Sequence, residues 1–428
     1  MYQFTFQLGI YLECTKGRPT ADRLPPLPLH IDYRCTTGPI TEHDESGIYH
    51  ALRLRDCARQ IILHLPPSVL HKCLVLMDGH FPILEHLSLW SVEDKITTIT
   101  LPKAFLAPNL RHLDIPGIGR PPKRLRLLTS TLSLGSLVLW NIQACSYFRP
   151  KLLVARLSCL PQLKKLTIGF SIPIPLPRTE RELLGEQRTS VTLPNLAHLT
   201  LRGVSAYLES FLAQIRAPLL ERFDITFFNQ ITFALPHLSH LINTTERLKP
   251  PSAKVFFGKE EVFLVSLDRR LAGPFRLCVR CTQLDWQVHC AAQICNALIP
   301  ALSGVEQFVL DFHDTVLPTE WQNGEINSTT WHELLRPFVG MNELHIEDGL
   351  SKELSRALGE VGSDPCFLPN LRQIFAQDNV FALFIDTRQV MGRPIQFMGS
   401  TLPAFPKLIR NKRPPLLDQK HHPLGGER

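Results

Sequence analysis

The stretch Leu193–Val204, LPNLAHLTLRGV, carries apolar side chains at Leu196, Leu199, Leu201 and Val204, with one or two residues between them. An isolated amphipathic strand and one unit of a repeat would both show this spacing. Recurrence distinguishes the two, because a repeat reappears along the chain with apolar residues at the same positions.

The pattern does recur, with apolar residues at its fourth, seventh and ninth positions and usually Pro or a small residue near its start. The clearer copies are FPILEHLSL (81–89), APNLRHLDI (107–115), LPQLKKLTI (160–168), LPNLAHLTL (193–201) and APLLERFDI (217–225). The weaker copies are TLSLGSLVL (131–139), LSGVEQFVL (302–310), FVGMNELHI (338–346) and LPNLRQIFA (368–376). Successive copies begin about 24 to 36 residues apart, except across a long gap between Leu220 and Val305, which is close to the leucine-rich-repeat period.

This spacing has a physical cause. The seventh and ninth residues of a copy alternate in a short strand and point into one core, and the fourth enters that core from the preceding turn. A unit of this size cannot bury its apolar edge alone, so neighbouring units must stack into a parallel sheet. The crossovers then need apolar faces of their own, and helices are predicted at 66–79, 205–218, 330–338 and 351–358.

The predicted fold class is α/β, as an irregular leucine-rich-repeat solenoid with a curved parallel sheet and helices on its convex side. It is irregular because the slot after the strand that commonly holds Asn or Cys holds Asn only at 379. Further strands are predicted at 27–33, 58–65, 253–258, 261–267 and 275–281, and a helix at 288–298. We expect an irregular segment at 1–23, the solenoid at 24–391 and a disordered basic tail at 392–428.

Composition limits where in the cell the protein is expected. The chain has 428 residues, is 44% hydrophobic and 20% charged, and carries a formal net charge of +7. No apolar run reaches the roughly 18–20 residues that a membrane span needs, so no membrane association is expected. Eleven cysteines with irregular spacing, and no secretory signal in the first residues, predict reduced thiols in an intracellular protein, cytoplasmic or nuclear.

The repeats and three further phrases resemble fungal F-box-like proteins, from large basidiomycete families with a leucine-rich-repeat-like C-terminal part. The phrases are PLPLHIDYR (26–34), HALRLRDCARQIILHLPP (50–67) and PTEWQNGEINSTTWHELLRPF (318–338), and the resemblance covers roughly residues 24–375. In that family an F-box binds the Skp1 adaptor of a ubiquitin ligase, and the repeat region recruits the protein to be ubiquitinated. The F-box itself is not found in this sequence. The resemblance therefore implies a protein-interaction scaffold, and a substrate receptor of an SCF-type ligase if an F-box is supplied upstream.

Metal and catalytic motifs are weak. Cys278, Cys281, Cys290 and Cys295 superficially resemble zinc-ligand spacing. The first two fall on a strand, where residues i and i+3 face opposite sides, so buried thiols are the favoured interpretation. His237 and His240 lack the acidic partner of a zinc-protease helix, and no nucleophile elbow or phosphate-binding loop occurs. We expect no catalytic residues, no metal, no cofactor and no enzyme activity.

Partner contacts are predicted for outward-facing strand residues and for the loops at strand ends. The candidates are Trp140, Asp311, Asp314, Glu320 and Trp321. The basic cluster at 120–126 lacks interleaved aromatic residues, which argues against nucleic-acid binding, and the cluster at 407–415 lies in the predicted tail. Two alternatives stay open beside the scaffold: a degenerate or orphan repeat protein without a ligase link, and a weak nucleic-acid binder that uses its basic surface.

Overall fold

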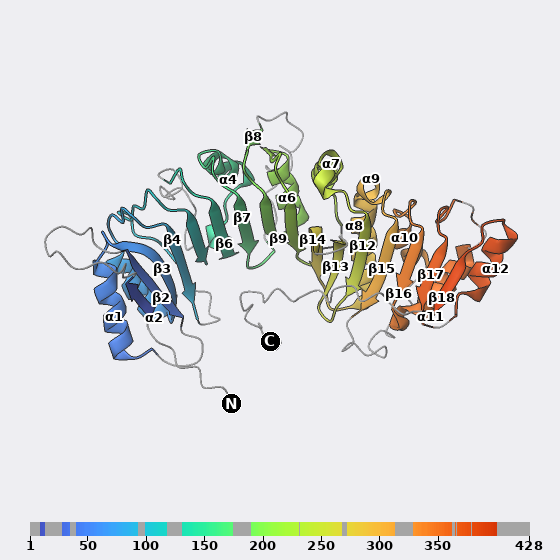
Figure 1. Ribbon diagram of the computed structural model, residues 1–428, viewed down its shortest axis with the longest axis horizontal. Coiled ribbons are helices and arrows are strands. Elements are labelled where there is room, and N and C mark those ends of the chain that lie inside the picture. The colour runs from blue at the N-terminus through green and yellow to red at the C-terminus, as the bar shows by residue number, and fades with distance from the viewer. Residues whose placement is uncertain are drawn as a thin grey trace, which may run out of the picture. The chain divides into compact units, whose positions relative to one another are not determined.

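The structure, a computed structural model, shows a mixed α/β protein with mostly parallel strands (Figure 1). It describes residues 9–12, 28–34, 40–92, 99–117, 131–173, 190–230, 232–267, 272–312, 328–361, 364, 366–377 and 379–399. These residues fall into two compact units, one before Phe148 and one from Phe148 onward. The predicted α/β class is confirmed.

Unit 1 is a small sheet whose strands follow one another in chain order. Its elements are β1 (Gly9–Leu12), β2 (Leu29–Arg34), α1 (Glu42–Arg53), β3 (Ala58–Leu65), α2 (Pro67–Leu76), β4 (His86–Ser91), β5 (His112–Pro116), β6 (Ser136–Ile142) and the 3-10 helix η2 (Ala144–Ser146). The strand order is β1-β2-β3-β4-β5-β6, with β1 antiparallel to β2 and the other pairs parallel. Helix α1 begins after Thr41, whose hydroxyl accepts a hydrogen bond from the Asp44 N–H (3.1 Å), and α2 begins with Pro67.

Unit 2 is longer. Its first elements are α4 (Pro150–Leu157), β7 (Lys165–Phe170), β8 (Val191–Thr192), β9 (His198–Gly203), α6 (Ser205–Leu212), β10 (Ile215–Arg216), β11 (Arg222–Phe227), α7 (Pro236–Thr244) and η4 (Glu246–Leu248). They are followed by β12 (Ser252–Phe257), β13 (Glu261–Leu267), β14 (Ala272–Arg280), α8 (Leu284–Ala297), α9 (Ile299–Leu302), β15 (Gln307–Phe312), α10 (Ser328–Leu335), β16 (Glu343–Ile346), α11 (Asp348–Val361), β17 (Gln373–Ala376), α12 (Ala382–Val390) and β18 (Gln396–Gly399). The strand order is β7-β9-β11-β14-β13-β12-β15-β16-β17-β18, and β8 pairs separately with β10.

The repeat copies share one local structure in both units. In every copy the N–H of the fourth residue donates to the carbonyl of the first, so each copy opens with a tight turn. Every side chain at the fourth, seventh and ninth positions is at most 3% exposed. Where copies are neighbours within a unit, their strands pair in parallel, as the stacking argument predicts.

The long gap between repeat copies departs from the predicted parallel sheet. The strands β12, β13 and β14 occur where predicted, but β13 is antiparallel to both of its neighbours. Only residues 258–260 join β12 to β13, and so short a link permits an antiparallel hairpin but no parallel crossover. The expectation of a parallel sheet is therefore wrong for this part of unit 2.

The ends of the predicted solenoid also differ from expectation. Residues Gln396–Gly399, placed by the sequence in a disordered tail, form β18 and pair in parallel with β17. The buried Arg388 guanidinium on α12 donates to the carbonyls of Phe367 (3.1 Å) and Leu368 (2.9 Å), which ties the last helix to the turn before β17. The pairing of β18 with β17 therefore extends the sheet beyond residue 391.

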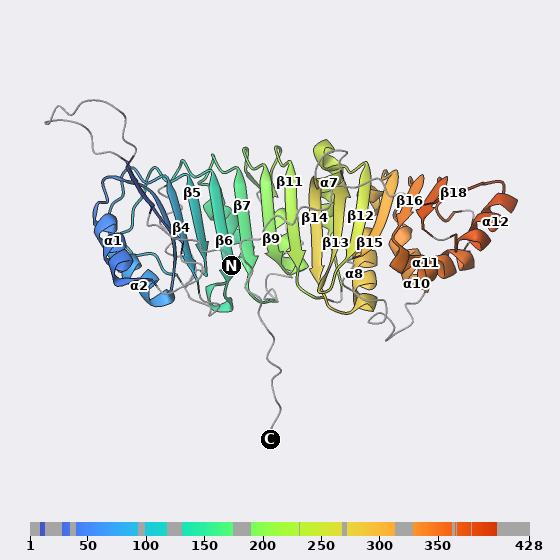
Figure 2. The same cartoon turned by 60° about the horizontal axis from the view of Figure 1, so that its bottom comes forward.

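Helices and strands form separate layers. In each unit the helices lie on one side of the strands (Figures 1 and 2). In unit 2 helices pack against one another in the pairs α4–α6, α6–α7, α7–α9, α8–α10, α10–α11 and α11–α12. In unit 1 helix α1 packs on α2. One sheet face is therefore covered by helices, and the side chains on the other face remain for other contacts.

Candidate functional site

The candidate site is the sheet face opposite the helices, called here the open face. Side chains alternate along a strand, so the sixth and eighth positions of each repeat copy face away from the buried seventh and ninth. The sixth positions of unit 1 are His86, His112 and Ser136. Those of unit 2 are Lys165, His198, Arg222, Gln307, Glu343 and Gln373. Parallel pairing places neighbouring members side by side within each unit.

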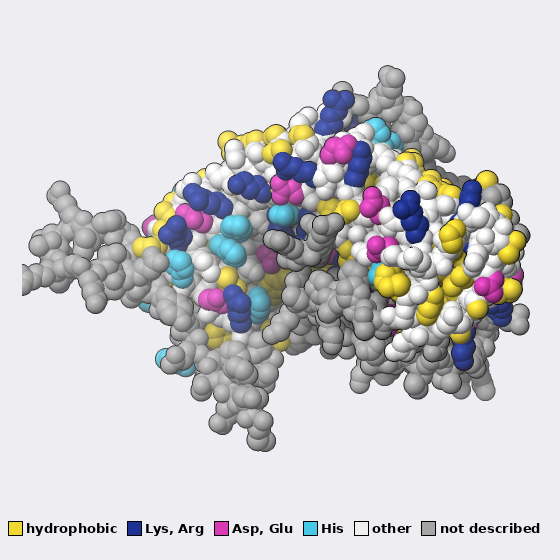
Figure 3. All heavy atoms as spheres, turned by 45° about the vertical axis from the view of Figure 1, so that its right-hand side comes forward, with side chains coloured by type: hydrophobic (Ala, Val, Ile, Leu, Met, Phe, Trp, Pro, Cys, Tyr) yellow, Lys and Arg dark blue, Asp and Glu magenta, His cyan; other side chains and the backbone are white. Residues whose placement is uncertain are grey.

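On unit 1 the open face carries a histidine surface, formed by His64, His86, His112, Trp90 and Asp114. The rings of His86 and His112 have centroids 5.3 Å apart, and those of His64 and Trp90 lie 5.9 Å apart. The Trp90 indole N–H donates to Asp114 Oδ2 (3.1 Å), which holds the indole in place. Figure 3 shows a face of the molecule on which histidine side chains gather among basic and acidic ones.

Two imidazoles of the histidine surface, those of His64 and His86, have a lowered pKa. Burial, and then the nearby Arg34, lower the pKa of His64. Burial, followed by His112 and Arg34, lowers the pKa of His86. Arg34 itself pairs with Asp32 (3.0 Å). The lowered pKa favours the neutral form of the His64 and His86 rings, which present apolar faces and polar edges as interface residues do.

Trp140, one of the predicted partner contacts, lies on β6 opposite Pro116 of β5. It is the residue after the ninth position of its copy, so its side chain shares the open face with the sixth and eighth positions. The indole is partly exposed. Its place on the open face agrees with the prediction, and whether it contacts a partner stays a prediction.

Asp311, the second predicted contact, is already engaged within unit 2. It forms an ion pair with Lys254, and the two side chains are only 18% and 12% exposed. Sequence reasoning missed Lys254 because it belongs to the hairpin in the long gap, and only the parallel pairing of β12 with β15 brings it beside Asp311. Asp311 can therefore meet a partner only together with Lys254.

Beside this ion pair, on the side of the sheet away from the helices, lies an apolar patch whose members Phe263, Val265 and Cys278 are only 2–7% exposed. Phe256 packs against them. The Arg276 guanidinium lies 4.3 Å from the Phe263 ring centre. Such stacking shields the apolar ring from water while it leaves a cation at the surface. The residues come from three antiparallel strands, so no repeat signal marked them.

The cysteines of the long gap do not assemble into one site. Cys278 lies in the apolar patch, where burial, and then Glu261, raise the pKa of its thiol. Cys281 hydrogen-bonds to Cys290, and this contact raises the pKa of Cys281. Cys295 is buried in α8. Among the described residues no group of three or more His, Cys, Asp or Glu side chains could hold a metal ion.

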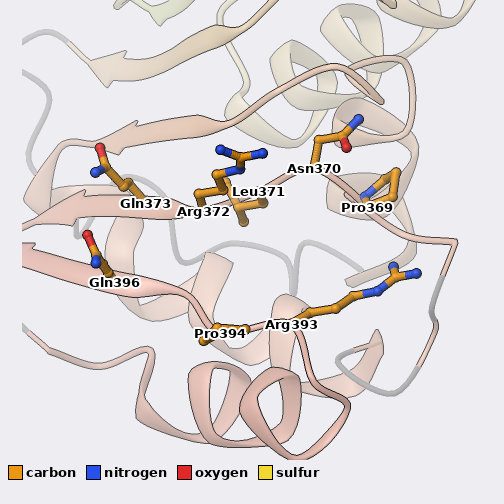
Figure 4. Close-up of a pocket in the computed structure, with 8 residues that line it drawn as sticks. All are labelled: Pro369, Asn370, Leu371, Arg372, Gln373, Arg393, Pro394 and Gln396. Atoms are coloured by element: carbon orange, nitrogen blue, oxygen red, sulfur yellow. The ribbon is translucent and has the colours of Figure 1, made fainter.

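A pocket lies between the segments that lead into β17 and β18 (Figure 4). Its volume is about 440 Å³, and its lining includes Arg372 and Gln373 on one segment and Arg393, Pro394 and Gln396 on the other. Sequence reasoning missed this pocket, because Arg393 and Gln396 fell in the predicted tail.

The remaining predicted contacts, Asp314, Glu320 and Trp321, lie outside the described residues, as does the basic cluster at 120–126. No family model matches this chain. A comparison with curated proteins also finds no match. Within the part of the chain that the structure describes, every helix is too short or too polar to cross a membrane.

Proposed function

We propose that the protein is a non-catalytic interaction scaffold, and that its open face binds protein partners. We propose further that each unit is a segment of an irregular leucine-rich-repeat solenoid. The observation that carries the proposal is the register of the repeat strands. Because these strands pair in parallel, they align the sixth and eighth side chains in rows that run across each unit.

The composition of these rows supports a protein partner. Interface centres are enriched in aromatic residues and Arg, and the partly exposed Trp90, Trp140 and Arg276 lie on the open face. The helices already cover the opposite face, so a partner that contacts the strands meets prearranged side chains. Prearrangement lowers the entropic cost of binding.

The resemblance to F-box-like proteins adds a finer proposal. In this version the protein acts inside the cell, in the cytoplasm or nucleus, as substrate receptor of an SCF-type ubiquitin ligase. Skp1 would bind an F-box supplied upstream, and the open face would bind the protein to be ubiquitinated. The scaffold proposal does not depend on this ligase connection.

Site-specific cross-linking tests the scaffold proposal. A photoreactive amino acid is placed at Trp140 on the open face or, as the control, at Leu383, which is 70% exposed on α12. We expect partner proteins to be cross-linked from position 140, and the cross-links to disappear when unlabelled wild-type protein is added in excess. Cross-links of equal strength from position 383 would contradict the choice of the open face.

A pull-down tests the ligase connection separately. Purified Skp1 is mixed with this chain and with a version extended upstream along its own reading frame. Retention of Skp1 by the extended version alone is the expected result. If neither version retains Skp1, the ligase connection fails, whereas the cross-linking result still decides the scaffold proposal.

A further inference from the structure

A row of basic side chains crosses three neighbouring strands of unit 2. Lys165 on β7, His198 on β9 and Arg222 on β11 are direct partners in the strand register, and all three are exposed. We call them the basic row. Over the described residues, neither Lys165 nor Arg222 has an ion-pair partner.

The acidic groups nearest in sequence to the basic row are occupied elsewhere. Asp224 lies two residues after Arg222 on β11, and its Oδ2 is 4.0 Å from a guanidinium nitrogen of Arg276. Glu221, just before β11, pairs with Arg247 (2.8 Å). The exposed Lys164 adds another positive charge before β7. The row therefore presents uncompensated positive charge on the open face.

We propose that the basic row binds an acidic segment of a protein partner, an extended peptide with Asp or Glu at alternate positions. This inference rests on the proposed function of the open face and names the partner chemistry for one part of it. The basis is charge complementarity: carboxylates form charge-assisted hydrogen bonds with Lys and Arg, and complementary charge also speeds association.

The spacing of the basic row fits such a peptide. Neighbouring strands lie about 4.8 Å apart, so the backbones that carry Lys165 and Arg222 are about 10 Å apart. Alternate side chains of an extended peptide point the same way about 7 Å apart, and the long Lys and Arg side chains can bridge the difference. His198 lies between them as a further hydrogen-bonding group.

The surroundings of the row favour a protein segment over a nucleic acid. Single strands of RNA or DNA are held by aromatic side chains on which bases stack. The next side chains along the same face are Thr167, Thr200 and Asp224, which offer no ring. The Phe228 ring in the same unit is covered by the Arg202 guanidinium at 5.3 Å.

Fluorescence anisotropy with two labelled peptides of sequence ESESES and QSQSQS tests the inference. We expect ESESES to bind the full chain, more weakly as salt rises, and QSQSQS not to bind. The double variant Lys165→Glu/Arg222→Glu should weaken ESESES binding about tenfold or more. The control Lys151→Glu/Lys352→Glu reverses two exposed lysines on α4 and α11, and it should bind within about twofold of the wild type.

Circular dichroism of each variant shows whether it folds, and a KSKSKS peptide supplies a second readout. The Lys165→Glu/Arg222→Glu variant should gain affinity for KSKSKS, which an unfolded protein would not do selectively. Equal binding of a single-stranded RNA oligonucleotide, lost in the same variant, would overturn the choice of a protein segment. If ESESES fails to bind while Trp140 still cross-links partners, this inference is wrong and the proposed function stands.

Discussion

At the scale of single residues, an asparagine joins one repeat copy to the one before it. The third-position amides of Asn109, Asn195 and Asn370 donate to the carbonyls of Pro82 (2.7 Å), Pro161 (2.8 Å) and Val339 (2.9 Å). Each acceptor is the second residue of the preceding copy. The sequence pointed to a missing amide ladder after the strand, and the structure shows amide bonds in the turn before the strand instead.

Removing one of these bonds should loosen the turn. We expect Asn195→Ala to lower the free energy of unfolding by about 1 kcal/mol, because the Pro161 carbonyl loses its donor. Leu219 holds the same third position in the next copy, is 46% exposed and has no amide to donate. Leu219→Ala is therefore the control, and it should change stability by less than about 0.5 kcal/mol in urea unfolding. Equal effects of the two substitutions would contradict a role for the amide.

Another single residue, Glu209, caps a helix to which it does not belong. Its carboxylate lies on α6, is 5% exposed, and accepts the N–H groups of His237 (2.7 Å) and Leu238 (3.1 Å) at the start of α7. Burial raises the pKa of Glu209 from 4.5 to about 7, although the two N–H groups oppose the rise. The native state therefore holds a proton that the unfolded chain releases at lower pH.

The proton on Glu209 should make the free energy of unfolding depend on pH. A native pKa above the unfolded value gives a stabilising contribution that is complete below pH 4.5 and is lost as the pH rises through about 7. We expect the stability of the wild type relative to Glu209→Gln to fall across that range by up to about 3 kcal/mol. Urea unfolding of both proteins at several pH values measures the difference. A difference that stays constant across the range would show that Glu209 does not titrate there.

At the scale of elements, the turn before β16 leaves no room for a side chain at its third position. In the copy at 338–346, the Gly340 N–H donates to the carbonyl of Ser303 (3.0 Å), where other copies use an asparagine amide. The backbones approach so closely that a Cβ on Gly340 would overlap the Ser303 carbonyl oxygen. Gly304, at the same position of the preceding copy, has open space around it.

The two glycines form a matched pair for measurement. Gly340→Ala should destabilise unit 2 by about 1–3 kcal/mol, because the added methyl group must push the two turns apart. Gly304→Ala should be neutral or slightly stabilising, since it meets no atom and reduces the freedom of the unfolded chain. Thermal unfolding of both variants checks this order, and the reverse order would rule out the close approach of the turns.

Repeat periodicity also limits which elements could be foreseen. The strands of the copies were predicted together with their parallel stacking and their buried positions, because the apolar residues mark which side faces the core. The strands β12, β13 and β14 were predicted as strands, but their order and directions were not. They lack the motif, and only their short connection and their neighbours in space determine how they pair.

At the scale of the whole molecule, we expect a destabilising substitution in one repeat copy to affect the stability of its neighbours only. Each repeat copy contacts its neighbours, so stability is close to a sum of units and nearest-neighbour terms. Leu113 on β5 and Leu344 on β16 are both seventh-position residues, 1% and 0% exposed. They provide equivalent core sites, one in each unit.

Reciprocal core substitutions test this local behaviour. Leu113→Ala and Leu344→Ala should each cost about 2–5 kcal/mol where they occur, from lost burial and the cavity left behind. In hydrogen exchange, Leu113→Ala should reduce protection in β4, β5 and β6 and leave β15, β16 and β17 unchanged, with the opposite result for Leu344→Ala. Loss of protection in all six strands from either variant would indicate one cooperative structure.

The repeat motif predicted one part of the candidate site, and only the structure revealed the rest. The repeat motif correctly indicated that side chains beside the buried positions share an outer face, and this put Trp140 on the open face. The motif did not predict the ion pair of Asp311 with Lys254, because Lys254 belongs to a hairpin without the motif. The sequence also did not predict the pocket beside Arg393, because the segment around Arg393 carries no repeat pattern.

The amino-acid sequence by itself determined the strand–turn unit, its buried positions and the parallel stacking of neighbouring copies. These follow from local spacing, because one short unit cannot bury its own apolar edge. Only the tertiary structure decided the antiparallel insertion, the ion pair of Asp311 with Lys254 and the capping of α7 by Glu209. Those contacts join residues far apart in the chain, and which residues meet depends on how strands and helices outside the repeat pattern pack.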